Sequence, residues 1–321
     1  IQPGRGLAAP PQPLAELNVP EYPRITSPSL NVTVVLGAVS NTLKDIMRGR
    51  GGLNPKGQYI FVLPPRLFDG HRVYGEMEFL VYFNAFVRGN LFKPNGQRVQ
   101  IVGTAAQLDA LKQYLQYTIF GPDWKGDPHW LTRAGHPALS AEERTFFQAM
   151  HDHYAVRSKD GSIIPVEGYI EPIVFNSRGI ATVDVRDDQN QVTGHIMVRA
   201  VQPGVGRVTA YQVSEQLGTG VEQNLGELPV RYNLPEPPLY GLTELHRKAL
   251  EGGRYGFART WIGTSNGFDP GNDTTSLILW LEGIGVWVDP SHEALRYLQP
   301  LGLTEEDVPY ILVTHVHQDH D

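Results

Sequence analysis

Four side chains of the kinds that bind metal ions stand within six residues at the end of the 321-residue chain. They are His315, His317, Asp319 and His320, and they follow Thr314. Imidazole nitrogens together with a carboxylate suit Zn, and also Fe or Mn. In an extended loop His315 and His317 project to the same side, whereas Asp319 and His320 follow a turn and face a second position. The spacing therefore predicts a site for two divalent metal ions, with Zn favoured.

Two metal ions held about 3.5–4 Å apart can share a hydroxide and hold a phosphoryl or acyl oxygen during a displacement reaction. The motif thus predicts a metal-dependent hydrolase that acts through a hydroxide bound to two metal ions. The alternative interpretation is a polar loop that is rich in histidine by chance. Three histidines and one aspartate within six residues, directly after an apolar strand, favour the metal site.

The segments before the motif must form the frame that holds these donors. Tyr310–Val313 is apolar and predicts a buried strand that leads directly into His315. Tyr255–Ile262, Thr275–Leu281 and Ile284–Val288 are rich in β-branched and aromatic residues, and they predict three further strands. We therefore expect the metal donors to follow the last strand of a small sheet.

Three short motifs in this region resemble those of the metallo-β-lactamase superfamily. Thr314–His320 resembles its second motif, T/S-H-x-H-x-D-H. Gly263–Phe268 and Asn272–Ser276 resemble the opening of its phosphodiesterase and tRNA 3′-processing branch, and Asp289 resembles the aspartate that ends the third strand in these proteins. The resemblance covers about residues 255–321.

The resemblance implies roles for the candidate residues. His315 and His317 would bind the first metal ion, and Asp319 and His320 the second. Asp319 would also act in catalysis by positioning or deprotonating the attacking water. The substrate would be a small phosphodiester, such as a cyclic nucleotide. The family completes its site with a third histidine, a bridging aspartate and a final histidine, which follow the second motif, so we expect the 321-residue chain alone to be inactive.

The rest of the chain predicts an α+β protein. We expect a proline-rich extended arm at 1–30, a mixed α/β domain at 31–240, a linker helix within 241–254, and the first half of an αββα metallo-β-lactamase fold at 255–321. The mixed domain resembles the leading domain of bacterial two-domain proteins that carry such a hydrolase, at Tyr59–Pro65, Glu78–Phe83 and Gln100–Pro122. Its predicted elements are strands at Asn31–Val39, Gln58–Leu63, Arg72–Val87 (in part helical) and Val99–Gly103, helices at Thr104–Ile119 and from Ser140, and a β meander at Ile163–Val213.

Composition limits the partners of the protein. The net charge is −7, and residues 255–321 hold ten acidic against two basic side chains. No cluster of Lys and Arg indicates a general nucleic-acid surface, and no run of about 18 apolar residues predicts a membrane span. The N-terminus carries no signal-peptide pattern, and we expect a cytoplasmic protein, although a signal removed by processing would leave the compartment open. The arm at 1–30 is expected to lie on its own domain or on a neighbouring subunit of a homo-oligomer.

Two alternatives to a hydrolase stay open. Residue 1 is Ile and the last residue follows the metal motif at once, so the chain is expected to be a piece of a longer polypeptide. The chain is then either part of a hydrolase or a non-catalytic structural component with an incomplete metal site. A third possibility is a sensor, in which a ligand of the leading domain controls the hydrolase.

His151 and His153 flank Asp152, but in a helix they would face different directions, which favours solvent-facing or capping roles.

Overall fold

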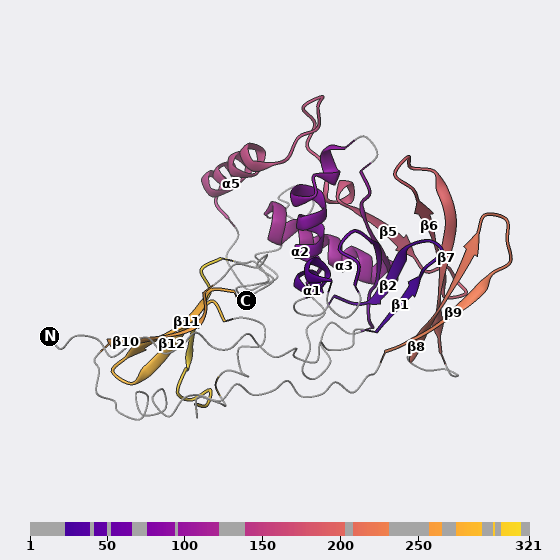
Figure 1. Cartoon of the computed structure of the whole chain (residues 1–321). Helices are drawn as coiled ribbons and strands as arrows, with labels where there is room; N and C mark the ends of the chain where they lie inside the picture. Colours follow the sequence, from indigo (N-terminus) through magenta and orange to yellow (C-terminus); the bar gives the residue numbers. More distant parts are fainter. Residues whose placement is uncertain are drawn as a thin grey trace, which may run out of the picture.

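The computed structural model confirms the α+β fold (Figure 1). It describes residues 23–38, 42–49, 53–65, 76–93, 96–121, 139–202, 208–230, 257–264, 274–290, 298 and 303–315. The described residues form three sheets with helices between the strands of the first. Most of the predicted arm, and all of the predicted linker helix, lie outside these ranges. No helix among the described residues is both long enough and apolar enough to cross a membrane.

The first sheet has five strands in chain order. They are β1 (Arg24–Ser27), β2 (Val32–Leu36), β3 (Gln58–Val62), β4 (Val99–Gly103) and β5 (Ile170–Val174). β1 is antiparallel to β2, and the other neighbours are parallel. Parallel neighbours need a crossover connection, which is right-handed in nearly all proteins. Crossovers that all advance in the same direction place their helices on one face of the sheet.

The helices on that face are α1, α2 and α3. Their bounds are α1 (Thr42–Arg48), α2 (Met77–Tyr82), continued by the π-helical η2 (Phe83–Val87) and the 3₁₀ turn η3 (Asn90–Phe92), and α3 (Ala105–Leu115), continued by the π-helical η4 (Gln116–Phe120). The prediction of a helix at Thr104–Ile119 is confirmed, and Thr104 and Gln107 form a capping box at its start. The predicted helix from Ser140 is also confirmed as α5 (Ala141–Tyr154). The 3₁₀ turn η5 (Val166–Gly168) then precedes β5.

An antiparallel sheet covers the opposite face of the first sheet (Figure 1). Its strands follow one another as β6 (Ile180–Arg186), β7 (Val192–Val201), β8 (Ala210–Leu217) and β9 (Gln223–Pro229). They confirm most of the predicted meander. The meander was predicted to begin at Ile163, but β5 instead pairs with β4 in the first sheet, which is a correction.

Both faces of the first sheet are therefore buried. Val32, Val34 and Leu36 of β2 pack toward the second sheet, whereas Val35 packs among the helices. Alternate residues of a strand point to opposite faces, so a strand covered on both sides needs apolar residues throughout. This explains why four of the five buried residues of β2 are apolar, while the fifth, Thr33, pairs its hydroxyl with that of Thr26 at 3.1 Å.

Arg72–Val87 is predicted as a strand that is in part helical; the helical part is confirmed, and no strand lies among the described residues of this segment. Residues 77–87 form α2 and η2. Their aromatic and β-branched composition favours strands, yet Met77, Leu80, Val81 and Ala85 are buried. Glu78 and Phe79 are buried as well, so burial is continuous over Met77–Val81, and packing in the folded domain overrides the local preference.

The third sheet carries the predicted metal motif. It contains β10 (Phe257–Gly263), β11 (Ser276–Leu281), β12 (Ile284–Val288) and β13 (Tyr310–Leu312), in that order, and all four strands were predicted. β13 pairs parallel with β12, whereas the other neighbours are antiparallel. Its own small core consists of Ile278, Trp280, Trp287, Leu298 and Val308.

Candidate metal centre

The metal motif begins where two parallel strands end side by side. Val288, the last residue of β12, stands opposite Leu312, the last residue of β13. The backbone N–H of Asp289 then donates a hydrogen bond to the Leu312 carbonyl at 2.9 Å. This bond extends the pairing by one step and brings Asp289 beside Thr314.

Asp289 fixes the residue that precedes the first histidine. One carboxylate oxygen accepts the Thr314 backbone N–H at 2.7 Å, and the other accepts the Thr314 hydroxyl at 2.7 Å. Asp289 is buried and has a φ of 49°, in the left-handed region that aspartate and asparagine tolerate better than most residues. Charge-assisted bonds of this kind are stronger than neutral ones, so they hold the chain firmly at the entry to the motif.

The same contacts set the protonation of His315. Its Nδ1 lies 2.9 Å from the Thr314 hydroxyl oxygen. Because that hydroxyl donates its proton to Asp289, its oxygen can only accept from His315, so Nδ1 carries the proton in the neutral imidazole. Nε2 then carries the lone pair. Metal-binding histidines commonly donate their second ring N–H in this way, which fixes the tautomer and the ring orientation.

The structure places one of the four predicted metal ligands. His315 lies at the exposed end of the sheet, whereas His317, Asp319 and His320 lie outside the described residues. Within the described ranges, no three His, Asp or Glu side chains gather closely enough to hold a metal ion. The described part of the motif fits a metal because His315 is exposed and its Nε2 carries the lone pair.

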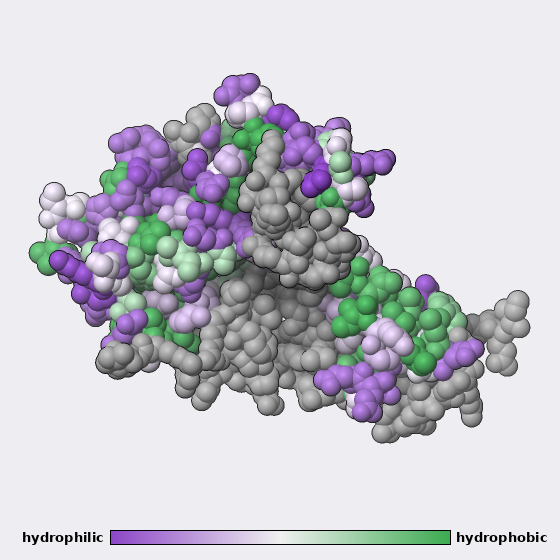
Figure 2. Space-filling model, turned by 180° about the vertical axis from the view of Figure 1, so that it is seen from behind, coloured by the Kyte–Doolittle hydropathy of each residue, from purple (hydrophilic) through white to green (hydrophobic). Residues whose placement is uncertain are grey.

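The strand before the motif differs from its prediction. β13 was expected to be buried, but Tyr310, Ile311 and Leu312 are 59%, 65% and 47% exposed. β13 is the edge strand of the sheet, and among the described residues it pairs only with β12. Figure 2 shows hydrophobic residues gathered over the third sheet, to which these three belong.

The His-Asp-His sequence at 151–153 does not form a second metal site. The three residues lie in the last turn of α5, and His151 Nδ1 contacts its neighbour Asp152 at 3.2 Å. The His151 carbonyl accepts the N–H of Ala155 at the end of the helix. Asp152 and His153 are exposed and His151 is half-buried, which agrees with the solvent-facing alternative expected from the sequence.

The sequence indicates Asp289 but not the residue that it binds. Asp289 resembles the aspartate that ends a strand in the family, whereas its two hydrogen bonds go to Thr314, 25 positions later in the chain. The sequence does contain an indication of these two bonds. The apolar strands Ile284–Val288 and Tyr310–Val313 end directly before Asp289 and Thr314. Pairing those strands in parallel would have brought the two residues together.

The comparisons with known proteins give two partial similarities. The chain is 43% identical over 65 residues to the cGMP-dependent 3′,5′-cGMP phosphodiesterase A of Dictyostelium discoideum, covering 20% of this chain and 8% of that protein. It is 42% identical over 64 residues to the cAMP/cGMP-dependent 3′,5′-cAMP/cGMP phosphodiesterase B of the same organism, covering 19% and 6%. The matched part of the chain thus spans less than a tenth of either relative. No family model and no solved structure matches the chain. About a fifth of the chain is therefore similar to cyclic-nucleotide phosphodiesterases.

Proposed function

We propose that this chain belongs to a metal-dependent phosphodiesterase that hydrolyses a cyclic nucleotide, with a metallo-β-lactamase type of site. The observation that carries the proposal is the hydrogen-bonded series Asp289, Thr314 and His315 at the entry to a His-x-His-x-Asp-His motif. The partial similarity to two cyclic-nucleotide phosphodiesterases supports the reaction class. The relatives come from Dictyostelium, so they do not bear on the bacterial lineage that the sequence resemblance suggested.

Each named residue has a distinct part in this proposal. His315 and His317 would hold one metal ion, and Asp319 and His320 a second. Zn, Fe or Mn at these positions would polarise the phosphoryl oxygens and lower the pKa of the attacking water. Asp289 and Thr314 would keep Nε2 of His315 deprotonated and aimed away from the strand. Asp319 would orient the water and accept its proton.

The reaction consumes one water molecule and needs no other reactant. The water oxygen bonds to phosphorus, one ester P–O bond breaks, and the leaving sugar oxygen takes up a proton. A cyclic nucleotide becomes a nucleoside monophosphate. The carboxylate of Asp319 suits the first proton transfer because it is a base that can lie within hydrogen-bond reach of the water.

The test measures metal content and hydrolysis by the natural full-length protein. Mass spectrometry of metals should find about two divalent ions per chain, and cAMP, cGMP or bis-p-nitrophenyl phosphate should be hydrolysed. His317→Ala should remove metal and activity together. His153→Ala, at the exposed end of α5, is the matched control and should change neither. A protein that holds no metal and turns over none of these substrates would instead fit the structural or sensor alternative.

A further inference from the structure

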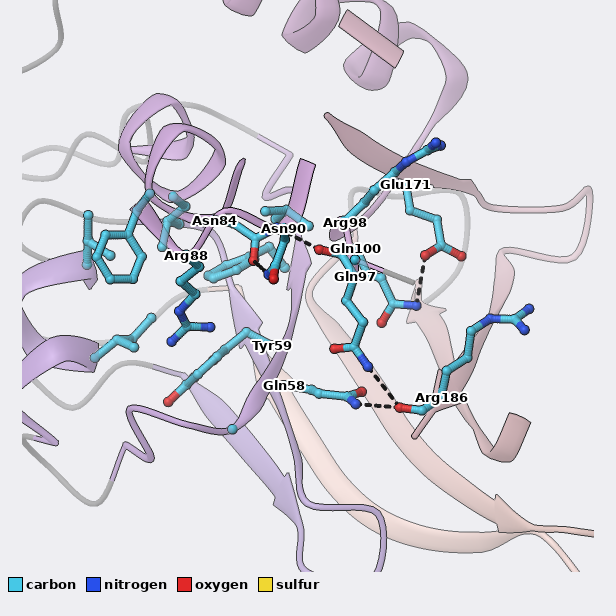
Figure 3. Close-up of a pocket in the computed structure, with 18 of the residues that line it drawn as sticks. Gln58, Tyr59, Asn84, Arg88, Asn90, Gln97, Arg98, Gln100, Glu171 and Arg186 are labelled. Atoms are coloured by element: carbon cyan, nitrogen blue, oxygen red, sulfur yellow. Dashed lines mark hydrogen bonds between the residues drawn. The ribbon is translucent and has the colours of Figure 1, made fainter. Parts of the chain in front are cut away.

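The leading domain contains a cavity of about 440 Å³ that is far in sequence from the metal motif. It lies at the amino ends of β3, β4 and β5, and its wall is completed by α1, by η2 and the turn after it, and by the hairpin between β6 and β7. The size falls within the usual range for small-molecule sites. Its lining includes the apolar Leu80 and Phe83. Figure 3 shows Arg88 and Tyr59 on one side of the cavity, and Gln58, Gln97 and Arg186 on the other.

The polar side of the cavity is held by hydrogen bonds between different elements. The Nε2 atoms of Gln58 and Gln97 both donate to the Arg186 backbone carbonyl, at 2.5 and 3.0 Å. Gln100 donates to the Asp184 carbonyl at 2.9 Å and to the Glu171 carboxylate at 3.2 Å. These bonds tie the end of β6 to the starts of β3 and β4, and Gln100 extends the link to β5, so the wall is pre-formed.

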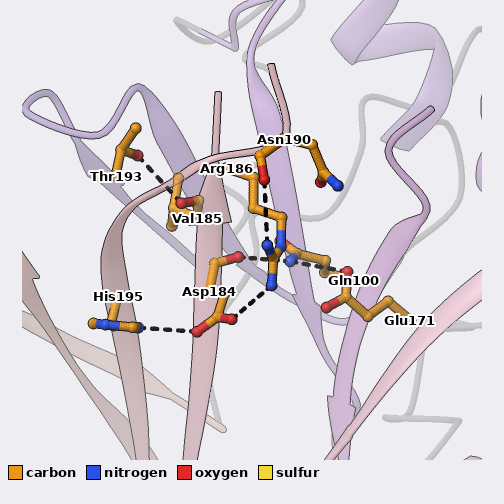
Figure 4. A network of polar contacts seen from close by, with 8 residues as sticks. All are labelled: Gln100, Glu171, Asp184, Val185, Arg186, Asn190, Thr193 and His195. Atoms are coloured by element: carbon orange, nitrogen blue, oxygen red, sulfur yellow. Dashed lines mark hydrogen bonds and ion pairs between the residues drawn. The ribbon is translucent and has the colours of Figure 1, made fainter. Parts of the chain in front are cut away.

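A second set of contacts fixes the hairpin side of this wall (Figure 4). The Asp184 carboxylate accepts from the Arg186 guanidinium at 2.8 Å and lies 3.0 Å from Nδ1 of His195. Arg186 also reaches the Asn190 carbonyl at 3.4 Å. The positive charge of Arg186 is therefore already paired with a carboxylate, so Arg186 does not need a bound anion.

Arg88 is different, because its charge is half-buried and its contacts are neutral. Its guanidinium donates to the Pro55 carbonyl and lies 5.2 Å from the centre of the Phe83 ring. No ion pair joins Arg88 to a carboxylate anywhere in the described part of the chain. Burial lowers the pKa of Arg88 below its usual value, which expresses the cost of holding this charge away from water. An anion bound beside it would offset that cost.

The cavity also offers an aromatic ring beside this cation and hydrogen-bond acceptors on its opposite side. The side-chain oxygens of Gln58 and Gln97 receive no hydrogen bond from the residues that the structure describes, although their nitrogens are used. The Tyr59 hydroxyl is anchored to the Asn54 carbonyl at 2.8 Å, and its ring stacks on Phe61. In Figure 3 the Arg88 guanidinium lies beside Tyr59, and the two glutamines point toward the Arg186 carbonyl on the other side of the cavity.

We propose that this cavity binds a small phosphorylated heterocycle of nucleoside-monophosphate size. The guanidinium of Arg88 would bind the phosphate, since its planar donors match phosphate oxygens. The two glutamine oxygens would accept from N–H groups on the edge of the heterocycle, and the aromatic side would contact its flat face. The expected ligand thus has an anionic group, N–H donors and a flat ring. A nucleotide has all three, whereas a simple carboxylate or inorganic phosphate has only the anionic group.

The test is ligand binding by the full chain, measured by calorimetry with defined probes. The probes are AMP, GMP, cAMP and cGMP, compared with adenosine, guanosine and inorganic phosphate. At least one nucleotide should bind more tightly than its nucleoside and than phosphate. Arg88→Gln should weaken that binding roughly ten- to hundredfold. Arg178→Gln changes an exposed arginine in the turn between β5 and β6 and should leave binding unchanged.

A chelator and His317→Ala separate this site from the metal centre. Nucleotide binding to the cavity should persist under both, even if phosphodiesterase activity is absent. Hydrogen exchange of the unaltered protein gives a second measurement, because the nucleotide should protect residues 84–90 and 97–100 whether or not Arg88→Gln folds. Absence of nucleotide binding, absence of this protection, or binding that is lost with His317→Ala and kept with Arg88→Gln would each overturn the proposal.

Discussion

Asp289 controls which nitrogen of His315 carries the proton, because the Thr314 hydroxyl between them has only one hydrogen to donate. Asp289→Asn tests this control of the tautomer, because it replaces one carboxylate oxygen with an NH₂ group. Asparagine tolerates the φ of 49°, but its NH₂ group can donate to the Thr314 oxygen. The hydroxyl would then turn and donate to Nδ1, which would move the proton of His315 to Nε2.

The expected result of Asp289→Asn is a fall of about ten- to hundredfold in metal affinity with the fold retained. Nitrogen NMR of the His315 ring should show the change of tautomer, which a purely structural role would not produce. Asp187→Asn is the matched control, since Asp187 also accepts two hydrogen bonds, from the N–H groups of Gln189 and Gln191, in the β6–β7 turn. Unchanged metal affinity and an unchanged tautomer in Asp289→Asn would refute the positioning role.

At the scale of elements, helix α5 depends on its capping box. The Ser140 hydroxyl accepts the Glu143 N–H at 3.2 Å, and the Glu143 carboxylate accepts the Ser140 N–H at 2.8 Å. These bonds favour the charged carboxylate, so they lower the pKa of Glu143 below its usual value of 4.5. A group with a lowered pKa stabilises the fold above the unfolded-state value, and this contribution is lost as the pH falls through the lowered pKa.

The prediction for this cap is that Ser140→Ala raises the pKa of Glu143 part of the way toward 4.5 and lets the first turn of α5 fray. The rise is partial because the backbone N–H of residue 140, the larger cause of the lowered pKa, is kept. Carbon NMR of the Glu143 carboxylate during a titration measures the pKa directly. Thr104→Ala removes the equivalent residue from α3 and should leave the Glu143 titration unchanged. A Glu143 pKa that does not move in Ser140→Ala would show that the cap is not formed in solution.

The elements differ in how far the sequence could predict them. The Ser140 cap and the apolar runs of β2, β3 and β4 are local signals, and they gave the correct elements. Residues 77–87 could not be assigned from composition, because their helical form depends on a sheet face that more distant residues build. The same limit explains the cavity around Arg88. Its lining comes from segments between Leu43 and Asn190 that only the folded sheet brings together.

The whole molecule contains hydrophobic cores that do not share residues. The first sheet joins two large clusters, one on each face, while the third sheet has a cluster of five buried residues among those described. The described part of that core buries fewer apolar side chains than either of the other two clusters, and less apolar burial gives less stability. We therefore expect the third sheet, which carries the metal motif, to unfold at a lower temperature than the leading domain, in a separate transition.

Matched substitutions at two fully buried isoleucines test this independence. Ile278 lies in the core of the third sheet and Ile60 in the first, and both are 0% exposed. Each change to alanine should lower the free energy of unfolding of its own part by about 2–5 kcal/mol. Calorimetry should show Ile278→Ala moving only the lower transition and Ile60→Ala only the upper one. A single transition that both variants shift would mean that the sheets fold as one unit, and that the metal motif draws its stability from the leading domain.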